Sequence, residues 1–206
     1  MHEEGGGTPA GMITPRRREK IIRTAAARQQ GVVVLEDIHD PHNAEAVFRT
    51  CDAFGFQHVA LIFEQQQPFD PRRIGKATSS SANKWLTFSV YHSTEECLAA
   101  LKAQGYEIAA TVLSARAESL FEADLTRSRL ALLLGNEHRG LSQRAIDLAD
   151  RHLIIPMSGM VQSLNLSVSA AICLYEITRQ RHAAGIDAYR LPPDEQARLI
   201  EDLIRR

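Results

Sequence analysis

Three polar loops contain the residues that could do chemistry, and each loop follows an apolar run. The last loop lies between the run at 153–155 and a helical pattern, and it contains Gly159, Ser163 and Asn165. Free backbone N–H groups in such a loop, with the positive end of the next helix, attract negative groups. Hydroxyl and amide side chains there could hold a substrate. Alternatively, Ser163 and Asn165 are only helix caps.

A second loop of the same kind lies within the stretch 132–142. Here an apolar run breaks at Gly135, and a helix begins near Ser142. Ligands of open α/β sheets bind beyond the carboxyl ends of the strands, so two such loops predict a shared pocket. The chain has neither the phosphate-binding G-x-x-x-x-G-K-[ST] pattern nor G-x-G-x-x-G. This argues against a P-loop nucleotidase and a dinucleotide-dependent oxidoreductase.

A third loop follows the apolar run at 32–35 and leads into a helical pattern that ends at Gly55. Asn43 is the expected N-cap of this helix. Its apolar stripe includes Val47, and Arg49 falls about 200° around the helix from that residue, so we expect Arg49 to point away from the core. It is then free to meet a ligand, although a solvated surface arginine is the alternative.

Together, these stretches resemble the SPOUT superfamily of RNA methyltransferases, and within it the TrmH group. The match comprises Asn43 with Arg49, residues 135–137 with Gly140, and residues 156–165, in the order expected of the three family motifs. The likeness covers nearly the whole chain after the first dozen residues. Members of the group methylate ribose 2'-hydroxyls with S-adenosylmethionine, and the resemblance is greatest to enzymes that modify guanosine 18 in the tRNA D-loop.

The resemblance implies a set of site residues. Those expected to be catalytic are Arg49, Asn43, Glu137, Ser163 and Asn165. Those expected to bind the cofactor are Thr111, Leu134, Gly135, Ile155, Met157, Ser163 and Leu164. A guanidinium is effectively always protonated, so we expect Arg49 to orient the ribose or phosphate and stabilise developing alkoxide charge, rather than act as a base. Asn43 is expected to hold Arg49 in place.

The elements that must position these residues alternate between strands and helices, which predicts an α/β fold with a mainly parallel sheet flanked by helices. We expect strands near 31–38, 58–63, 85–91, 107–113, 129–135 and 151–156. The resemblance adds a C-terminal deep trefoil knot and a homodimer in which the arginine of one subunit faces the cofactor pocket of the other. We expect a flexible tail over 1–12 and one domain over 13–206.

Charge is distributed unevenly along the chain, whose formal net charge is −1. The helix expected over about 14–29 contains six basic residues against Glu19 alone, and a further basic segment precedes a helix expected over about 193–205. Such patches attract phosphates, although a solvated basic face is the alternative. With the methyltransferase motifs they favour tRNA binding, through Arg16, Arg17, Arg18, Arg23, Lys84, Arg179 and Arg181.

Other classes of protein find little support in the sequence. Cys51, Cys97 and Cys173 are widely spaced and expected to be free thiols. No Cys or carboxylate set at zinc spacing accompanies His39 and His42, so we expect no metal. No apolar run could span a membrane and no signal-peptide pattern opens the chain, so the expected location is the cytoplasm.

Two alternatives stay open at this point. The same chemistry could act on another tRNA position or on ribosomal RNA, since the motifs do not name the nucleotide. A non-catalytic RNA-binding protein could also keep this fold, although the intact set of catalytic residues speaks against it. Cofactor binding and methylation of a panel of unmodified RNAs would separate these hypotheses.

Overall fold

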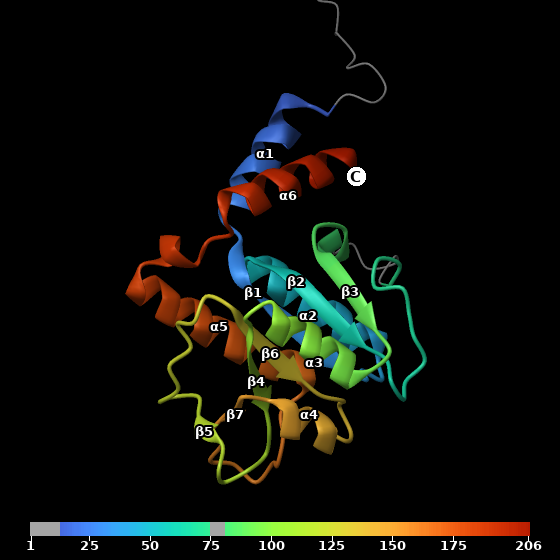
Figure 1. Cartoon of the computed structure of the whole chain (residues 1–206), viewed down its shortest axis with the longest axis vertical. Coiled ribbons are helices and arrows are strands. Elements are labelled where there is room, and N and C mark those ends of the chain that lie inside the picture. Colours follow the sequence, from blue (N-terminus) through green and yellow to red (C-terminus); the bar gives the residue numbers. More distant parts are fainter. Residues whose placement is uncertain (1–12, 75–80) are drawn as a thin grey trace, which may run out of the picture.

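The computed structural model describes residues 13–74 and 81–206, and at its centre lies a seven-stranded sheet (Figure 1). The sheet order is β3-β2-β1-β6-β4-β7-β5, and every pairing is parallel. The strands are β1 (Gln29–Glu36), β2 (Phe56–Ile62), β3 (Thr87–Tyr91), β4 (Glu107–Thr111), β5 (Glu118–Ser119), β6 (Leu130–Leu134) and β7 (Arg151–Ile154). The predicted parallel α/β sheet is confirmed, and β5 is an addition.

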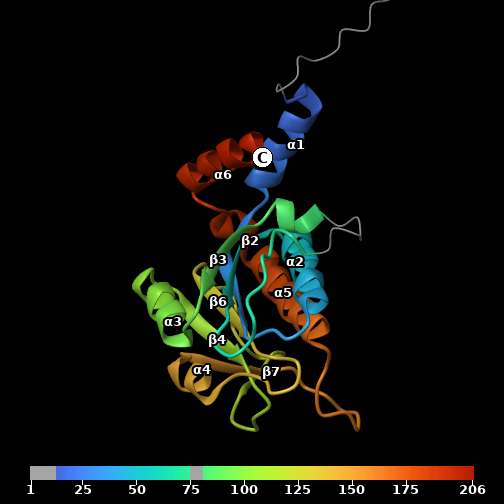
Figure 2. The ribbon, with the colours of Figure 1, turned by 90° about the vertical axis from the view of Figure 1, so that its right-hand side faces the viewer.

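Helices cover both faces of the sheet (Figure 2). On one face lie α2 (Pro41–Phe54) and α5 (Leu166–Ala184), and on the other lie α3 (Thr94–Ala103) and α4 (Gln143–Leu148). In β1, Val33 and Leu35 enter the first core, whereas Val32 and Val34 enter the second. Strands buried on both faces need no polar alternation, which explains the continuous apolar runs in the sequence.

The two ends of the described chain pack together away from the sheet centre (Figure 1). Helix α1 (Pro15–Ala26) contacts α6 (Pro193–Arg205) through a small separate core that includes Ile21, Leu199 and Leu203. The short helices η1 (Ser81–Lys84) and η2 (Ile186–Tyr189) lie before β3 and α6. Because β1 already begins at Gln29, the N-terminal helix is shorter than the predicted 14–29.

Local signals in the sequence place most helix ends correctly. Thr14 caps α1, accepting from the Arg17 N–H at 3.2 Å, and Ser93 and Ser142 cap α3 and α4. Gly55 ends α2 with φ 80°, a left-handed conformation that favours glycine. The prediction that Asn43 caps α2 is wrong, because Asp40 occupies that position and Pro41 follows it.

Several general expectations can be compared with the structure. Cys51, Cys97 and Cys173 are buried free thiols, as predicted, and burial raises the pKa of Cys97 and Cys173 to about 12. No helix in the described ranges is long and apolar enough to cross a membrane. Within the same ranges, no three His, Cys, Asp or Glu residues are grouped to hold a metal. The expected tail at 1–12 lies outside the described residues.

Candidate active site

A cleft of about 650 Å³ lies at the carboxyl ends of β4, β6 and β7. Its walls come from the ends of these strands and from the loops 135–142 and 155–165. All the residues expected to bind the cofactor line this cleft, namely Thr111, Leu134, Gly135, Ile155, Met157, Ser163 and Leu164. The parallel sheet thus brings together segments more than 40 positions apart in the sequence, as the rule for ligand sites in open sheets anticipates.

Gly135 allows the loop after β6 to fold back on itself. A Cβ at this position would lie 2.3 Å from both the Gly140 carbonyl carbon and the Leu141 nitrogen. Asn136 and Gly140 exchange backbone hydrogen bonds of 3.0 and 2.9 Å, which close the loop. Any side chain at 135 would have to displace backbone atoms, so this loop requires glycine.

Asn136, which the sequence did not assign to the site, holds the same loop in place. It is 6% exposed, and its Nδ2 donates to the Asp37 carbonyl at 2.6 Å. Its Oδ1 accepts from the N–H groups of His138 and Arg139 at 2.8 and 3.1 Å. This side chain therefore joins the loop after β6 to the loop after β1. Its position in the second motif, two residues after the end of a buried strand, was the available signal.

Glu137 joins the same two loops from the cleft side. Its carboxylate accepts from the His39 N–H at 2.9 Å, the Asp40 N–H at 3.2 Å and the Asn43 Nδ2 at 3.0 Å. Burial alone would raise the pKa of this carboxyl, but the three hydrogen bonds outweigh burial and hold the pKa below its ordinary value. Glu137 is therefore ionised at neutral pH and lies at the positive end of α2.

Asn43 links Glu137 to the third loop. Asp40 accepts from the His42 N–H at 2.9 Å and so performs the capping predicted for Asn43. Asn43 lies within the first turn instead, where its Nδ2 donates to Glu137 and its Oδ1 accepts from the Asn165 Nδ2 at 3.3 Å. A chain of hydrogen bonds through these three side chains thus connects all three sequence motifs.

Asn165 also caps α5, which confirms the helix-cap interpretation of this residue. Its Oδ1 accepts from the Ser167 N–H at 2.8 Å and from the Ser167 Oγ at 2.6 Å, while its Nδ2 reaches Asn43. The helix begins at Leu166. Ser163 does not cap it; its side chain is exposed and lines the cleft.

Arg49 lies on the exposed face of α2, as its helical position predicts. Within residues 13–74 and 81–206 it makes no hydrogen bond or ion pair, so the expected contact with Asn43 is absent. Arg49 is also not among the residues that line the cleft. One copy of the chain therefore does not bring this arginine to the cleft beside Glu137.

Two adjacent acids at the end of β1 fix the surroundings of the cleft and were not predicted. Glu36 is 2% exposed and accepts from the Ser142 N–H at 2.8 Å and from the Thr94 Oγ1 at 2.7 Å, which ties α3 and α4 to the strand. Asp37 has φ 51° and accepts from three successive N–H groups over 64–66. Together they anchor the loops on either side of β1.

Comparison with known proteins identifies the family to which this chain belongs. The profile of the SpoU rRNA Methylase family matches residues 30–175, which include all three motif loops. The chain belongs to the SpoU family. It is 39% identical over 192 residues to the tRNA (guanosine(18)-2'-O)-methyltransferase of Escherichia coli, covering 91% of this chain and 82% of that protein. The protein of the same name from Thermus thermophilus is 38% identical over 195 residues, covering 94% and 98%.

Solved structures agree with the family assignment. The TrmH/SpoU tRNA modifying enzyme of A. aeolicus superposes with a TM-score of 0.82 at 29% identity, covering 92% of this chain and 95% of that one. The SpoU methyltransferase AviRb from Streptomyces viridochromogenes, solved in complex with AdoMet, gives a TM-score of 0.66 at 26% identity, covering 78% and 62%. The SpoU-family fold is therefore present over nearly the whole chain.

The basic residues expected to bind RNA in this SpoU-family chain differ in their exposure and in their ion pairs. Arg16, Arg17, Arg18 and Arg23 are exposed on α1, and Lys84 is exposed at the end of η1. Arg179 is exposed on α5 but already pairs with Glu176 at 2.7 Å. The α1 arginines therefore offer the clearest cationic surface among the described residues.

The prediction that Arg181 contacts RNA is wrong, because this side chain is completely buried. Its Nη1 donates to the Gln30 carbonyl at 2.6 Å and its Nη2 donates to the Arg127 carbonyl at 2.7 Å. The guanidinium also lies over the rings of Phe56 and Tyr189, and burial lowers the pKa of Arg181 to about 10. Arg28, counted in the basic N-terminal segment, is likewise buried and pairs with Asp52 at 2.5 Å.

Proposed function

We propose that the chain transfers the methyl group of S-adenosylmethionine to the ribose 2'-hydroxyl of guanosine 18 in tRNA. The observation that carries this proposal is the hydrogen-bond chain from Glu137 through Asn43 to Asn165, which gathers the three motif loops beside one cleft. The relatives from Escherichia coli and Thermus thermophilus are named for this reaction and align over most of the chain. The activity, cofactor and substrate proposed for this chain rest on this hydrogen-bond chain together with the relatives.

The cleft fits the cofactor in size and chemistry. Its volume of about 650 Å³ lies within the range of small-molecule sites, and its lining combines apolar side chains such as Leu134 and Ile155 with loop backbone. When bound, S-adenosylmethionine supplies a methyl group on a positively charged sulfur. Glu137, ionised and facing the cleft, adds a negative charge that favours this cation. The residues proposed to hold the cofactor are those predicted from the sequence.

Arg49 is proposed to act on the nucleotide rather than on the cofactor. A guanidinium has five N–H donors and a positive charge, so Arg49 can donate to a ribose or phosphate oxygen and stabilise negative charge developing on the 2'-oxygen. Positioning of that oxygen in line with the methyl group supplies much of the remaining rate enhancement. Glu137, Asn43, Ser163 and Asn165 are proposed to shape the loops that position it.

We further propose that the active form is a homodimer in which Arg49 of one subunit faces the cleft of the other. Support comes from the absence of Arg49 from the lining of its own cleft and from its lack of a partner in the described ranges. Large apolar side chains are also exposed on and beside α5. They are Met160 and Val161 in the loop 155–165, and Val168 and Tyr175, seven residues apart on one face of α5.

Further features follow from the family membership. We propose that the loop 155–165 and α5 form the C-terminal trefoil knot expected of the superfamily, and that residues 13–206 form one domain. The packing of α5 against α2, which brings the C-terminal part of the chain back onto its first half, supports this proposal. The tRNA is proposed to bind across α1, and the cytoplasm remains the expected location.

The deciding experiment is methyl transfer from labelled S-adenosylmethionine to an unmodified tRNA transcript, with the labelled nucleotide mapped. We expect label on the ribose of guanosine 18, and a loss of at least about 100-fold in the Arg49→Ala variant. Lys102→Ala, which removes an exposed cation from α3, is the matched control and should keep full activity. A transcript with 2'-deoxyguanosine at position 18 should accept no label.

Other outcomes point to the alternatives. Label at a different nucleotide, or only on ribosomal RNA fragments, would retain the chemistry and change the substrate. Cofactor binding without transfer to any RNA of the panel would contradict the catalytic proposal. Failure to bind S-adenosylmethionine would favour a non-catalytic RNA-binding protein.

A further inference from the structure

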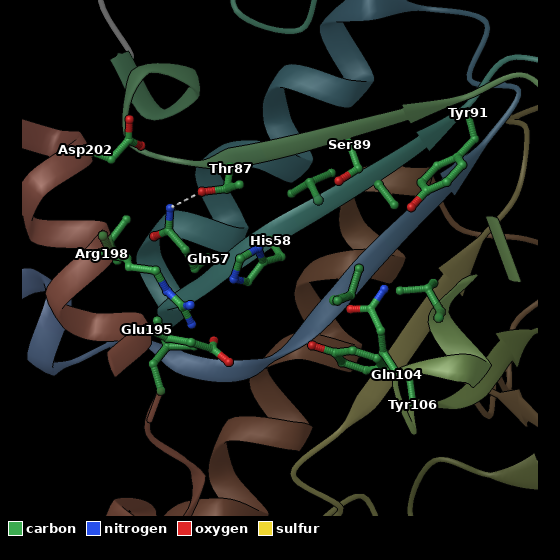
Figure 3. Close-up of a pocket in the computed structure, with 16 residues that line it drawn as sticks. Gln57, His58, Thr87, Ser89, Tyr91, Gln104, Tyr106, Glu195, Arg198 and Asp202 are labelled. Carbon is green, nitrogen blue, oxygen red and sulfur yellow. Dashed lines mark hydrogen bonds between the residues drawn. The ribbon is translucent and has the colours of Figure 1, made fainter. Parts of the chain in front are cut away.

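A second cavity, of about 380 Å³, lies between the sheet and α6 (Figure 3). Its floor is formed by residues 57–60 of β2 and by alternate residues along β3, and its walls come from α6 and from the segment between α3 and β4. It shares no lining residue with the cleft, and it plays no part in the proposed methyl transfer. Its hydrogen-bonding groups define the kind of ligand that it suits.

Gln57 leaves a hydrogen-bond acceptor without a partner at one end of the cavity. The side chain is 1% exposed, and its Nε2 donates to the Trp85 carbonyl at 2.8 Å and to the Thr87 Oγ1 at 3.1 Å. A carbonyl can only accept, so the amide cannot be flipped. Its Oε1 has no partner among the described residues. An unpaired buried oxygen is costly, and a ligand N–H group would satisfy it.

Other polar groups in the lining are partly engaged. Gln104 donates its Nε2 to the Ala100 carbonyl at 3.1 Å, which leaves its Oε1 as an acceptor. Arg198 donates to the Asp194 carboxylate at 2.7 Å, and Asp202 is paired with Arg206. The charged groups Arg198 and Asp202 are thus each paired with a neighbour on or directly after α6, whereas the Gln104 oxygen, like that of Gln57, is an acceptor that no described residue uses.

Glu195 gives the cavity its uncompensated charge. This carboxylate is partly buried and makes no ion pair or hydrogen bond within the described part of the chain. Figure 3 shows it pointing into the same space as the His58 ring and the Tyr106 hydroxyl. Burial lowers the pKa of His58, although Glu195 opposes part of that shift, so His58 does not supply the missing positive charge at neutral pH. With the two ion pairs neutral, the lining has a net charge of −1.

We propose that this cavity binds a small aliphatic amine or guanidine. An ammonium group has three N–H donors and a guanidinium has five, which matches the unused acceptors Gln57 Oε1, Gln104 Oε1 and the Glu195 carboxylate. The hydroxyls of Tyr91 and Tyr106 offer further acceptors along the lining. An anionic ligand would face the Glu195 carboxylate, and the one cation of the lining, Arg198, already pairs with Asp194, which disfavours a phosphate.

Calorimetry on the full chain tests the proposal with agmatine and spermidine as probes. We expect at least one of them to bind with a dissociation constant of about 1 mM or below at low salt. Glu195→Gln keeps the shape of the side chain and removes its charge, and should weaken binding at least about tenfold. Glu201→Gln is the matched control, because Glu201 lies on the same helix, pairs with Arg205 and does not line the cavity. It should leave binding unchanged.

A neutral probe and the NMR signals of the His58 imidazole complete the test. Butylurea, which has N–H donors and no charge, should bind more weakly than agmatine, and agmatine should shift the imidazole NMR signals of His58. The proposal is overturned if neither cation binds when it is added at about 5 mM, a concentration well above the expected dissociation constant. Equal binding by Glu195→Gln, or equal binding of butylurea, would also overturn it. A thermal melt of Glu195→Gln verifies that this variant is folded.

Discussion

The side-chain amides of Asn43 and Asn165 meet at 3.3 Å, although 122 positions separate them in the sequence. Asn43 donates at the same time to Glu137, so a single amide contacts both of the loops that flank the cleft. The first turn of α2 and the first residue before α5 are thereby held together. In the proposed mechanism Asn43 is a positioning residue, and its effect can be measured separately from that of Arg49.

Substitution Asn43→Ala removes both of these hydrogen bonds. We expect kcat/KM for tRNA methylation to fall about 100-fold, since small misplacements of a site have effects of that size. The circular dichroism spectrum should be unchanged. His42→Ala, an exposed neighbour on the same helix, should keep near-normal activity, and an equal loss in both variants would contradict the assigned role.

Mixing of two inactive variants tests the shared site. If Arg49 acts in the partner's cleft, the Arg49→Ala and Asn165→Ala defects fall in the same site of a mixed dimer and leave the other site intact. Random exchange of subunits should restore about one quarter of the wild-type activity, since half of the dimers are mixed and one of their two sites is whole. Refolding of the two variants together and apart provides the comparison. No recovery in a verified mixed dimer would place Arg49 in its own subunit's site.

Glu137→Gln should change the dependence of stability on pH. The folded state holds the pKa of Glu137 below its ordinary value, so its contribution is fully present above that value and is lost as pH falls through the folded-state pKa. We expect the free energy of unfolding to drop by about 1–3 kcal/mol at pH 7. Urea titrations should show this difference shrinking at acid pH. Glu19→Gln, on the exposed surface of α1, should show no such trend.

The exposed arginines of α1 should govern the salt dependence of tRNA binding. Changing Arg16, Arg17 and Arg18 to alanine should weaken binding and flatten the plot of log affinity against log salt by about one unit for each lost phosphate contact. Filter binding over a salt series measures both quantities. Unchanged affinity and slope would remove α1 from the RNA surface.

Arg181→Met should affect stability and leave the salt slope as it is. Its guanidinium is buried and bonded to backbone carbonyls, so its removal leaves acceptors without donors and should cost about 3 kcal/mol of unfolding free energy. Chemical denaturation gives the stability, and tRNA binding below the melting temperature gives the slope. A flattened slope would return Arg181 to the RNA contacts.

Much of the fold could be predicted from local patterns. Apolar runs such as the one in β6, whose five residues are all buried, mark central strands without reference to the rest of the chain. The two residues of β5 were missed because so short a strand has no periodicity. The cap of α2 was predicted at Asn43 because the preceding Asp-Pro pair was not considered. That pair provides both the cap, Asp40, and a favourable first helical residue, Pro41.

The failed predictions concern residues whose surroundings come from distant segments of the chain. Arg181 follows Arg179 by two positions on α5, and nothing in their residue types distinguishes them. Their fates differ because one faces the start of β1 and the other faces solvent, a property of tertiary packing alone. Glu36 and Asp37 were missed for the opposite reason, since acids beside a strand suggest surface and their donors come from distant segments.

The contact between Arg181 and Gln30 spans 151 positions, and it closes the start of β1 against the end of α5. During synthesis on the ribosome, Gln30 emerges long before Arg181 exists, so the first strand must wait for almost the whole chain before its neighbourhood is complete. Contacts of such long sequence separation slow folding and lengthen exposure of the apolar strands. Nascent chains truncated before Arg181 should therefore depend most strongly on chaperones.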